Sequence, residues 1–267
     1  MANKRRIMAF AATLFVSSFA VGCSSTSQFT SNELAASVNG NWAFTTTATQ
    51  TAPQALTLNV GFTNPSKQTL SAIAHLAGAT CISSTTEITF FGSIDSNDQL
   101  ALTSKPFNGS TLLLNGQLAA DGKSLSNANW SFSGGNCAAL GSAKVVATAY
   151  AEINGTYSGN FVDKDNNKLA VSATLTQTSE PDANGQFHLS GSATFPGNPC
   201  FTQPVVTDSL VTGSSLSTTY TDSVSGATIT AVGTFNSAAT QLTVTNWQVS
   251  NGLCNGDSGT GLLVEPQ

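Results

Sequence analysis

Arginine is missing from this chain after position 6, and basic residues are few throughout. The first 22 residues hold Lys4, Arg5 and Arg6, and the remainder carries six lysines against fourteen aspartates and glutamates, a net charge of −8. Nucleic-acid binding depends on clustered lysine and arginine, and bidentate recognition of phosphate or carboxylate depends on arginine. The composition therefore excludes nucleic acid as a partner and argues against an arginine-based anion site.

Charge of either sign is scarce, at 9% of residues, and no long segment with helical periodicity follows residue 22. The composition of disordered chains, high charge with low hydrophobicity, is absent too, since 40% of the residues are hydrophobic. What is present is alternation, as in the segment 55–60 (ALTLNV), which places apolar side chains on one side of a strand. We therefore predict an all-β body.

The one long apolar run lies at the start of the chain. Lys4–Arg6 precede an apolar stretch over residues 7–21. Its length of about 15 residues falls short of the roughly 20 that a helix needs to cross a bilayer, so residues 1–22 are predicted to be a secretory signal. The stretch ends in Ala20-Val21-Gly22-Cys23, which resembles the lipobox of bacterial lipoproteins, with Ala20 where that family usually has leucine.

The lipobox resemblance implies that the Cys23 thiol receives a diacylglycerol, that residues 1–22 are removed and that the new N-terminus is acylated. Several acyl chains on one residue would anchor the protein stably in the cell envelope. Ser24 rather than aspartate after the cysteine implies the outer membrane in a Gram-negative host. Residues 23–37, rich in serine and threonine, are expected to form a flexible tether. The alternative is an ordinary secretory peptide with a chance cysteine.

The rest of the chain is predicted to contain one unit built twice. Aligning Cys81 and Cys137 with Cys200 and Cys254 brings four segments into correspondence over about 110 residues. The matches are VNGNW at 38–42 with INGTY at 153–157, HLAG at 75–78 with HLSG at 188–191, LSNANW at 125–130 with LTVTNW at 242–247, and SGGNC at 133–137 with SNGLC at 250–254. We predict a tandem duplication, with units at 38–151 and 152–267.

Turn signals divide each unit into about eight strands. The predicted strands are 40–48, 54–62, 69–77, 85–94, 98–104, 110–119, 124–133 and 142–150 in the first unit, and 154–162, 168–177, 185–195, 204–212, 215–221, 227–235, 240–249 and 259–264 in the second. Asn-Gly at 115–116 and 184–185 and Asp-Gly at 121–122 are expected to supply the positive φ of tight turns. Eight strands in an antiparallel meander close into a barrel or flatten into a sandwich.

The strand map predicts how the cysteines pair. The first cysteine of each unit falls in the loop after strand 3 and the second in the loop between strands 7 and 8, which a meander places at the same end. We therefore predict the disulfides Cys81–Cys137 and Cys200–Cys254, which an exported protein permits. In a round barrel these loops lie on opposite sides of the mouth, so each disulfide either straps the mouth or indicates a flattened sandwich.

The first strand opens with Gly40-Asn41-Trp42, which resembles the Gly-x-Trp motif of lipocalins, avidins and related calycin barrels. The resemblance implies that Trp42 plugs one end of a barrel, with Tyr157 in the same role in the second unit. The arginine that lipocalins carry near their last strand has no counterpart here. Trp130 and Trp247, matched residues of strand 7, are expected in the core, and all four aromatic residues are candidate lining of an interior pocket.

Three patterns resemble catalytic or metal sites without completing them. The segment 256–259 (GDSG) resembles the nucleophile segment of chymotrypsin-like proteases, but the matching histidine segment is missing, and a turn is predicted. His75 and His188, at matched positions of the repeat, lack the further ligands that a metal requires. The segment 163–167 (DKDNN) lacks the glycine and the final glutamate of an EF-hand and is predicted to be a solvated hairpin tip.

Because no nucleophile–base pair or metal cluster emerges, we expect neither an enzyme nor a cofactor. The expected function is that of a lipid-anchored envelope protein with a structural or interaction role, held to the membrane by its lipid and contacting a protein partner. The alternative is a binding protein that holds a small apolar ligand inside each calycin-like barrel. The two hypotheses differ in whether either unit encloses an apolar cavity.

Overall fold

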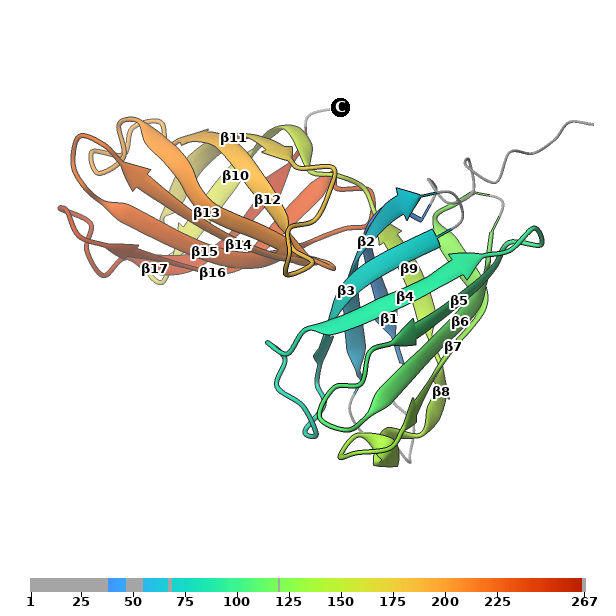
Figure 1. Ribbon diagram of the computed structural model, residues 1–267. Helices are drawn as coiled ribbons and strands as arrows, with labels where there is room; N and C mark the ends of the chain where they lie inside the picture. Colours follow the sequence, from blue (N-terminus) through green and yellow to red (C-terminus); the bar gives the residue numbers. More distant parts are fainter. Residues whose placement is uncertain (1–37, 47–54, 67–68, 120, 266–267) are drawn as a thin grey trace, which may run out of the picture.

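The computed structural model describes residues 38–46, 55–66, 69–119 and 121–265. Two closed, eight-stranded antiparallel β-barrels follow one another in this part of the chain, and its one helical element is the short 3-10 turn η1 (Ala138–Leu140). The all-β prediction is confirmed. In Figure 1 the second barrel, coloured yellow to red, extends away from the side of the first, coloured blue to green. The predicted signal peptide and tether, with Cys23, lie outside the described residues.

The first barrel is a meander that closes through the pairing of β6 with β7. Around the ring, each strand pairs with its neighbours in the order β1-β2-β3-β4-β5-β6-β7-β9. The short strand β8 pairs with β7 alone, so that β8 and β9 together occupy the eighth position. The strands are β1 (Gly40–Thr45), β2 (Thr57–Ser66), β3 (Thr69–Ala77), β4 (Ile88–Ile94), β5 (Gln99–Ser104), β6 (Thr111–Leu118), β7 (Ser124–Ser133), β8 (Ser142–Lys144) and β9 (Val146–Tyr150).

The second barrel closes without interruption, with β17 pairing back onto β10. Its strands are β10 (Asn154–Asp163), β11 (Lys168–Gln177), β12 (Phe187–Thr194), β13 (Pro204–Thr212), β14 (Ser215–Asp222), β15 (Thr228–Phe235), β16 (Gln241–Ser250) and β17 (Ser258–Val264). Residues 151–153 connect the two barrels, and the predicted unit boundary falls within them.

Alternation of buried and exposed residues explains why these segments form strands. Strands β3, β5 and β6 bury every second side chain, so that each presents one apolar face to the barrel interior. One local prediction is wrong: Asn115 and Gly116 do not form a turn but lie inside β6. Opposite them the register of β7 shifts, and Asn127 there takes a positive φ of 53°. Asn115 and Gly116 therefore lie opposite a bulge in β7 and not in a hairpin turn.

Both predicted disulfides are present, and each straps the mouth of a closed barrel. Cys81, in the β3–β4 loop, bonds Cys137, just before η1, with 5.2 Å between their Cα atoms. Cys200 bonds Cys254 in the same way, at 6.0 Å. Because the strands of both units close into rings, the disulfides are straps across an end and not signs of a flattened sandwich.

The second barrel contacts the first through the end opposite its disulfide. The loops at that end, 178–186, 213–214 and 236–240, meet the outer wall formed by β1, β2, β3 and β9. The inter-barrel contacts include a reciprocal pair of hydrogen bonds between Asn41 and Gly213, hydrogen bonds of His75 with Asn184 and of Ala151 with Ser237, and an edge-on contact of the Tyr150 and Phe235 rings. The two barrels therefore share a built interface and are not joined by a linker alone.

Glycine is required where β2 of the first barrel meets the loop 178–186 of the second. A Cβ atom on Gly61 of β2 would lie 2.5 Å from the carbonyl oxygen of Gly185 and 3.0 Å from Pro181 Cβ. By strand register, Gly61 pairs with Asn41 as Thr174 pairs with Thr156 in the second barrel. Thr174, which is exposed, therefore stands in the second barrel at the position that glycine occupies in the first.

Candidate functional site

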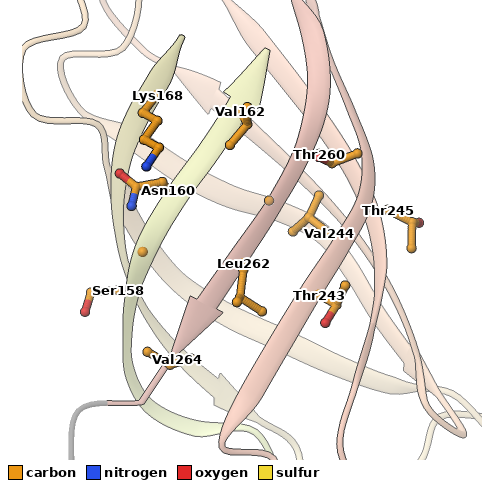
Figure 2. A pocket seen from close by; sticks show the side chains of 12 residues that line it. Ser158, Asn160, Val162, Lys168, Thr243, Val244, Thr245, Thr260, Leu262 and Val264 are labelled. Atoms are coloured by element: carbon orange, nitrogen blue, oxygen red, sulfur yellow. The ribbon is translucent and has the colours of Figure 1, made fainter. Parts of the chain in front are cut away.

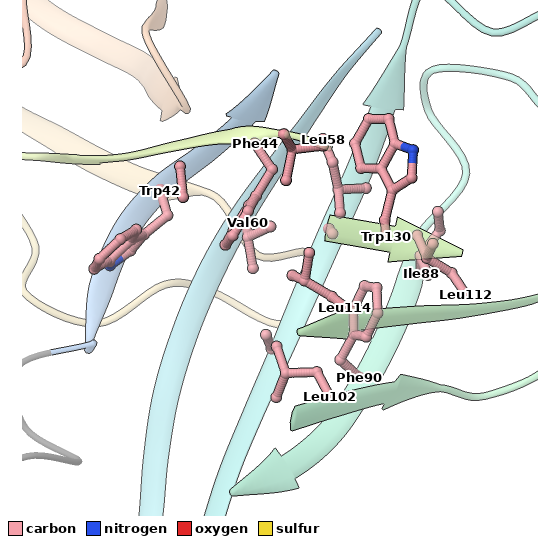
Figure 3. Close-up of a cluster of buried hydrophobic side chains, with 14 of the residues drawn as sticks. Trp42, Phe44, Leu58, Val60, Ile88, Phe90, Leu102, Leu112, Leu114 and Trp130 are labelled. Atoms are coloured by element: carbon pink, nitrogen blue, oxygen red, sulfur yellow. The ribbon is translucent and has the colours of Figure 1, made fainter. Parts of the chain in front are cut away.

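The interiors of both barrels are filled by apolar side chains. Trp130 and Phe44 have 0% of their surface exposed and Trp42 has 1%, and Figure 3 shows these side chains together with leucines and other apolar side chains of the surrounding strands. These three side chains are therefore shielded from water. The ring of Trp42 lies 6.3 Å from Phe44 and 6.2 Å from Phe62, centroid to centroid, so aromatic packing occupies this region.

The second barrel is packed in the same way, with its polar aromatic atoms satisfied. Trp247 stacks on Phe161 at 5.6 Å, and its Nε1 donates a hydrogen bond to the carbonyl oxygen of Thr260 at 3.0 Å. Tyr157, 1% exposed, donates through its hydroxyl to the carbonyl oxygen of Ala239 at 2.7 Å. Burial raises the pKa of Tyr157, with the nearby charge of Glu265 acting in the same direction. The predicted pocket-lining aromatic residues therefore lie within packed cores.

The two histidines do not occupy equivalent places, contrary to the sequence alignment. His75 is near the end of β3, whereas His188 is the second residue of β12. The reason lies before the strand: nine residues separate β11 from β12, whereas two separate β2 from β3, so the HLSG segment falls at the start of β12. Both histidines nevertheless form a hydrogen bond with the same loop, 178–186. His75 lies on the wall of the first barrel and His188 at the base of the second.

The contacts of the histidines are structural. His75 Nε2 lies 2.7 Å from the carbonyl oxygen of Asn184, which can only accept, so the ring donates. His188 Nε2 lies 3.1 Å from Asp182 Oδ2. Burial acts to raise the pKa of Asp182, but hydrogen bonds from the backbone of Gln186 and Asn184 and from His188 outweigh it and lower that pKa. Within the described ranges no three histidine, cysteine, aspartate or glutamate side chains gather as metal ligands would.

The acidic segment 163–167 forms the turn between β10 and β11. Asp163 Oδ1 accepts hydrogen bonds from the backbone N–H groups of Asp165 and Asn167, both at 2.8 Å. The side-chain and backbone hydrogen bonds from Asn167 lower the pKa of Asp163. Asp95 caps the β4–β5 turn in the same manner. These carboxylates serve turn formation.

The segment resembling a protease nucleophile is likewise a turn. Asp257 donates its backbone N–H to the carbonyl oxygen of Cys254, and Ser258 begins β17. Ser258 lies at the disulfide end of the second barrel, while His188 lies at the opposite end, against the first barrel. The geometry that a nucleophile and its base require is therefore not formed between them.

A buried carboxylate that the sequence did not reveal organises the disulfide end of the second barrel. Asp222 has 0% exposure and accepts five hydrogen bonds, from the backbone N–H groups of Thr202, Gln203, Val224 and Ser225 and from the Thr202 hydroxyl. These bonds, led by those from Ser225 and Gln203, hold the pKa of Asp222 far below its ordinary value. The one sequence signal was an aspartate ending a strand before Ser-Val-Ser-Gly, which is common in ordinary turns.

A hollow of about 730 Å³ lies on the outer wall of the second barrel, over β10, β17 and β16. Figure 2 shows Val162, Leu262 and Val264 in it, with Lys168 at one side and Ser and Thr side chains around. Gly261, beside this hollow, makes room inside the barrel, because a Cβ atom there would meet the buried Phe161 ring at 2.4 Å. Its lining offers aliphatic groups, hydroxyls, one amide and one ammonium, with no carboxylate or imidazole among the residues that form the hollow.

No protein-family model and no curated protein matches the sequence. Among solved structures, the chain is similar to a protein of unknown function from the DUF3598 family of Nostoc punctiforme. The match has 12% sequence identity, covers 88% of this chain and 98% of that chain, and has a TM-score of 0.27. Within the described residues, no helix is long and apolar enough to cross a membrane.

Proposed function

We propose that this protein is a lipid-anchored component of a bacterial cell envelope, in which two strapped barrels form a structural or interaction module without enzymatic activity. The observation that carries the proposal is the lipobox-type segment ending at Cys23, joined to a body whose barrel interiors are filled. A filled barrel cannot release or take up a ligand without unpacking, whereas its outer surface remains available for contacts. The two disulfides suit an oxidising, extracytoplasmic location.

The interface between the barrels supports a module of fixed geometry. Asn41 and Gly213 are hydrogen-bonded in both directions, and the backbones approach so closely at Gly61 that a Cβ atom there would clash with Gly185. Two barrels held at a fixed angle are better suited to act as a spacer or a scaffold than two barrels joined flexibly. The alternative of an apolar ligand inside each barrel has no observation in its favour, because the aromatic residues expected to line such a cavity pack against one another.

Metabolic labelling with a clickable fatty acid in a bacterial expression host tests the anchor. The wild type and a Ser25→Ala control should incorporate label and fractionate with detergent-extractable membrane, and in a Gram-negative host with the outer membrane. Cys23→Ser should incorporate none. Equal labelling of Cys23→Ser would overturn the proposal. Native mass spectrometry of the wild type tests the module's character: a co-purified apolar ligand in stoichiometric amount would instead support the carrier hypothesis.

A further inference from the structure

The far end of the second barrel presents two protruding aliphatic side chains. Among the described residues, Leu253 and Val224 are the most exposed large hydrophobic residues, at 89% and 76%. Val224 lies in the β14–β15 turn and Leu253 in the β16–β17 loop, and both belong to the end that points away from the first barrel. In Figure 1 this end of the barrel lies farthest from the junction. We call the loops 223–227 and 251–257 the distal tip.

Three contacts hold the two loops of the distal tip in place. The backbone N–H of Val224 bonds Asp222 Oδ1 at 2.8 Å, which fixes the turn to a buried carboxylate. The residue after Leu253 is Cys254, which is disulfide-bonded to Cys200. A Cβ on Gly252 would lie 2.9 Å from Ala227 Cβ, so the two loops are in contact. A buried charge and a disulfide thus fix two apolar groups in an exposed position.

The chemistry around these side chains indicates what would cover them. Protein interfaces draw most of their affinity from tryptophan, tyrosine and arginine in packed pockets, and the distal tip contains none of these residue types. Its other exposed residues are serine, glycine, asparagine and one carboxylate, Asp257. Two isolated aliphatic side chains on a tip bury little area against the rigid surface of a folded partner. A lipid bilayer is deformable and can surround them. Since the tip has no lysine, attraction to anionic headgroups is absent.

We propose that the distal tip inserts Val224 and Leu253 shallowly into a lipid surface with zwitterionic headgroups. That the tip and the lipid anchor contact the same membrane rests on the proposed function. The insertion of the tip into a lipid surface does not. Residues 23–37, if extended, span about 50 Å, and a ten-residue strand such as β10 spans about 33 Å. The two barrels begin at Val38 and are joined to the lipid at Cys23 through residues 23–37. They can therefore lie along the membrane with the distal tip in contact with it.

Vesicle flotation with residues 23–267 carrying Cys23→Ser tests the insertion without any acyl chain and without the apolar residues 7–21. Phosphatidylcholine–phosphatidylethanolamine vesicles should carry the protein upward, equally at low and high salt. The double variant Val224→Ser/Leu253→Ser should partition at least about tenfold more weakly, because two aliphatic groups no longer leave water. The matched control is Leu262→Ser/Val264→Ser on the barrel wall, where the same residue types are 47% and 41% exposed, and it should partition like the parent.

A second measurement follows the tip directly. Leu253→Trp should show a blue-shifted emission on adding the vesicles, while Leu262→Trp should not. Thermal unfolding should be unchanged in all of these variants, because each replaced side chain is exposed. Absence of flotation, an equal loss in the wall control, or binding only to anionic vesicles would overturn the proposal. Failure to label Cys23 with fatty acid would contradict the anchor alone and leave the vesicle result standing.

Discussion

Asn41 and Gly213 hydrogen-bond each other twice across 172 positions of sequence: Asn41 Nδ2 donates to the Gly213 carbonyl at 2.7 Å, and the Gly213 N–H donates to Asn41 Oδ1 at 2.8 Å. Asn41 is 3% exposed, so both bonds are shielded from water. One side chain on β1 thereby satisfies the backbone of the β13–β14 turn. This pair makes the relative position of the barrels specific.

Asn41→Ala should weaken the junction without unfolding either barrel. Removing the amide leaves the Gly213 N–H and carbonyl buried without partners, at a cost of about 1–3 kcal/mol. Small-angle scattering should show a broader distribution of inter-barrel distances, and the two barrels should unfold in separate calorimetric transitions. Asn129→Ala, which removes an exposed amide from β7, is the control and should change neither. Unaltered scattering from Asn41→Ala would mean that the remaining contacts alone hold the junction.

Asp222 should give the second barrel a dependence of stability on acid pH. Because its pKa is depressed in the folded state, its contribution is present above the ordinary aspartate pKa of about 3.9 and is lost as pH falls through the folded value. Urea midpoints should therefore drop below about pH 4 in the wild type. Asp222→Asn should lower the midpoint at pH 7 and flatten the acid decline, while the exposed Asp165→Asn should match the wild type.

The disulfide strap should contribute chiefly to the barrel that it closes. Cys200→Ser/Cys254→Ser opens a loop of 54 residues, worth about 4 kcal/mol in the chain-entropy model. Barrel-specific unfolding, followed by hydrogen exchange, should show the second barrel destabilised and the first unaffected. The converse pair, Cys81→Ser/Cys137→Ser, should reverse the pattern. Peptide mapping without reductant that joined Cys81 to Cys200 would contradict the two-barrel arrangement.

Truncating Trp130 distinguishes a packed interior from a ligand cavity. In a filled core, Trp130→Ala should cost about 3–5 kcal/mol, since the space it leaves cannot collapse fully. Chemical denaturation of the first barrel measures this loss. A cost below about 1 kcal/mol would indicate that the indole already faces open space, as in a carrier. Leu113→Ala, an exposed leucine on β6, serves as the control.

Strand positions were accessible from sequence because their signals are local. Alternation fixes which residues point inward, and glycine, asparagine and aspartate mark most turns, so the predicted strands of both units agree with the observed ones within a few residues. The incorrect turn prediction also rested on a local residue pattern. Asn115-Gly116 carries a hairpin signature but lies in β6 opposite a bulge, because pairing with β7 overrides the turn preference.

The histidine match shows a different limit of sequence comparison. The segments HLAG at 75–78 and HLSG at 188–191, which differ at one residue, suggested equivalent sites, yet they lie at opposite ends of corresponding strands. A loop of different length preserves the order of segments while shifting their register. Asp222 was missed for a related reason: what makes it unusual is burial with five donors, and no residue pattern encodes burial.

By itself, the sequence determined the all-β class, the duplication, the strand map and the pairing of Cys81–Cys137 and Cys200–Cys254, because each follows from periodicity, turn chemistry and the spacing of repeated residues. The tertiary structure alone decided closure into barrels, the filling of their interiors, the seating of one barrel on the wall of the other through Asn41 and Gly213, and the exposure of Val224 and Leu253. These depend on contacts between residues far apart in the chain, where packing volume and buried hydrogen bonds select one arrangement among many that share the same local pattern.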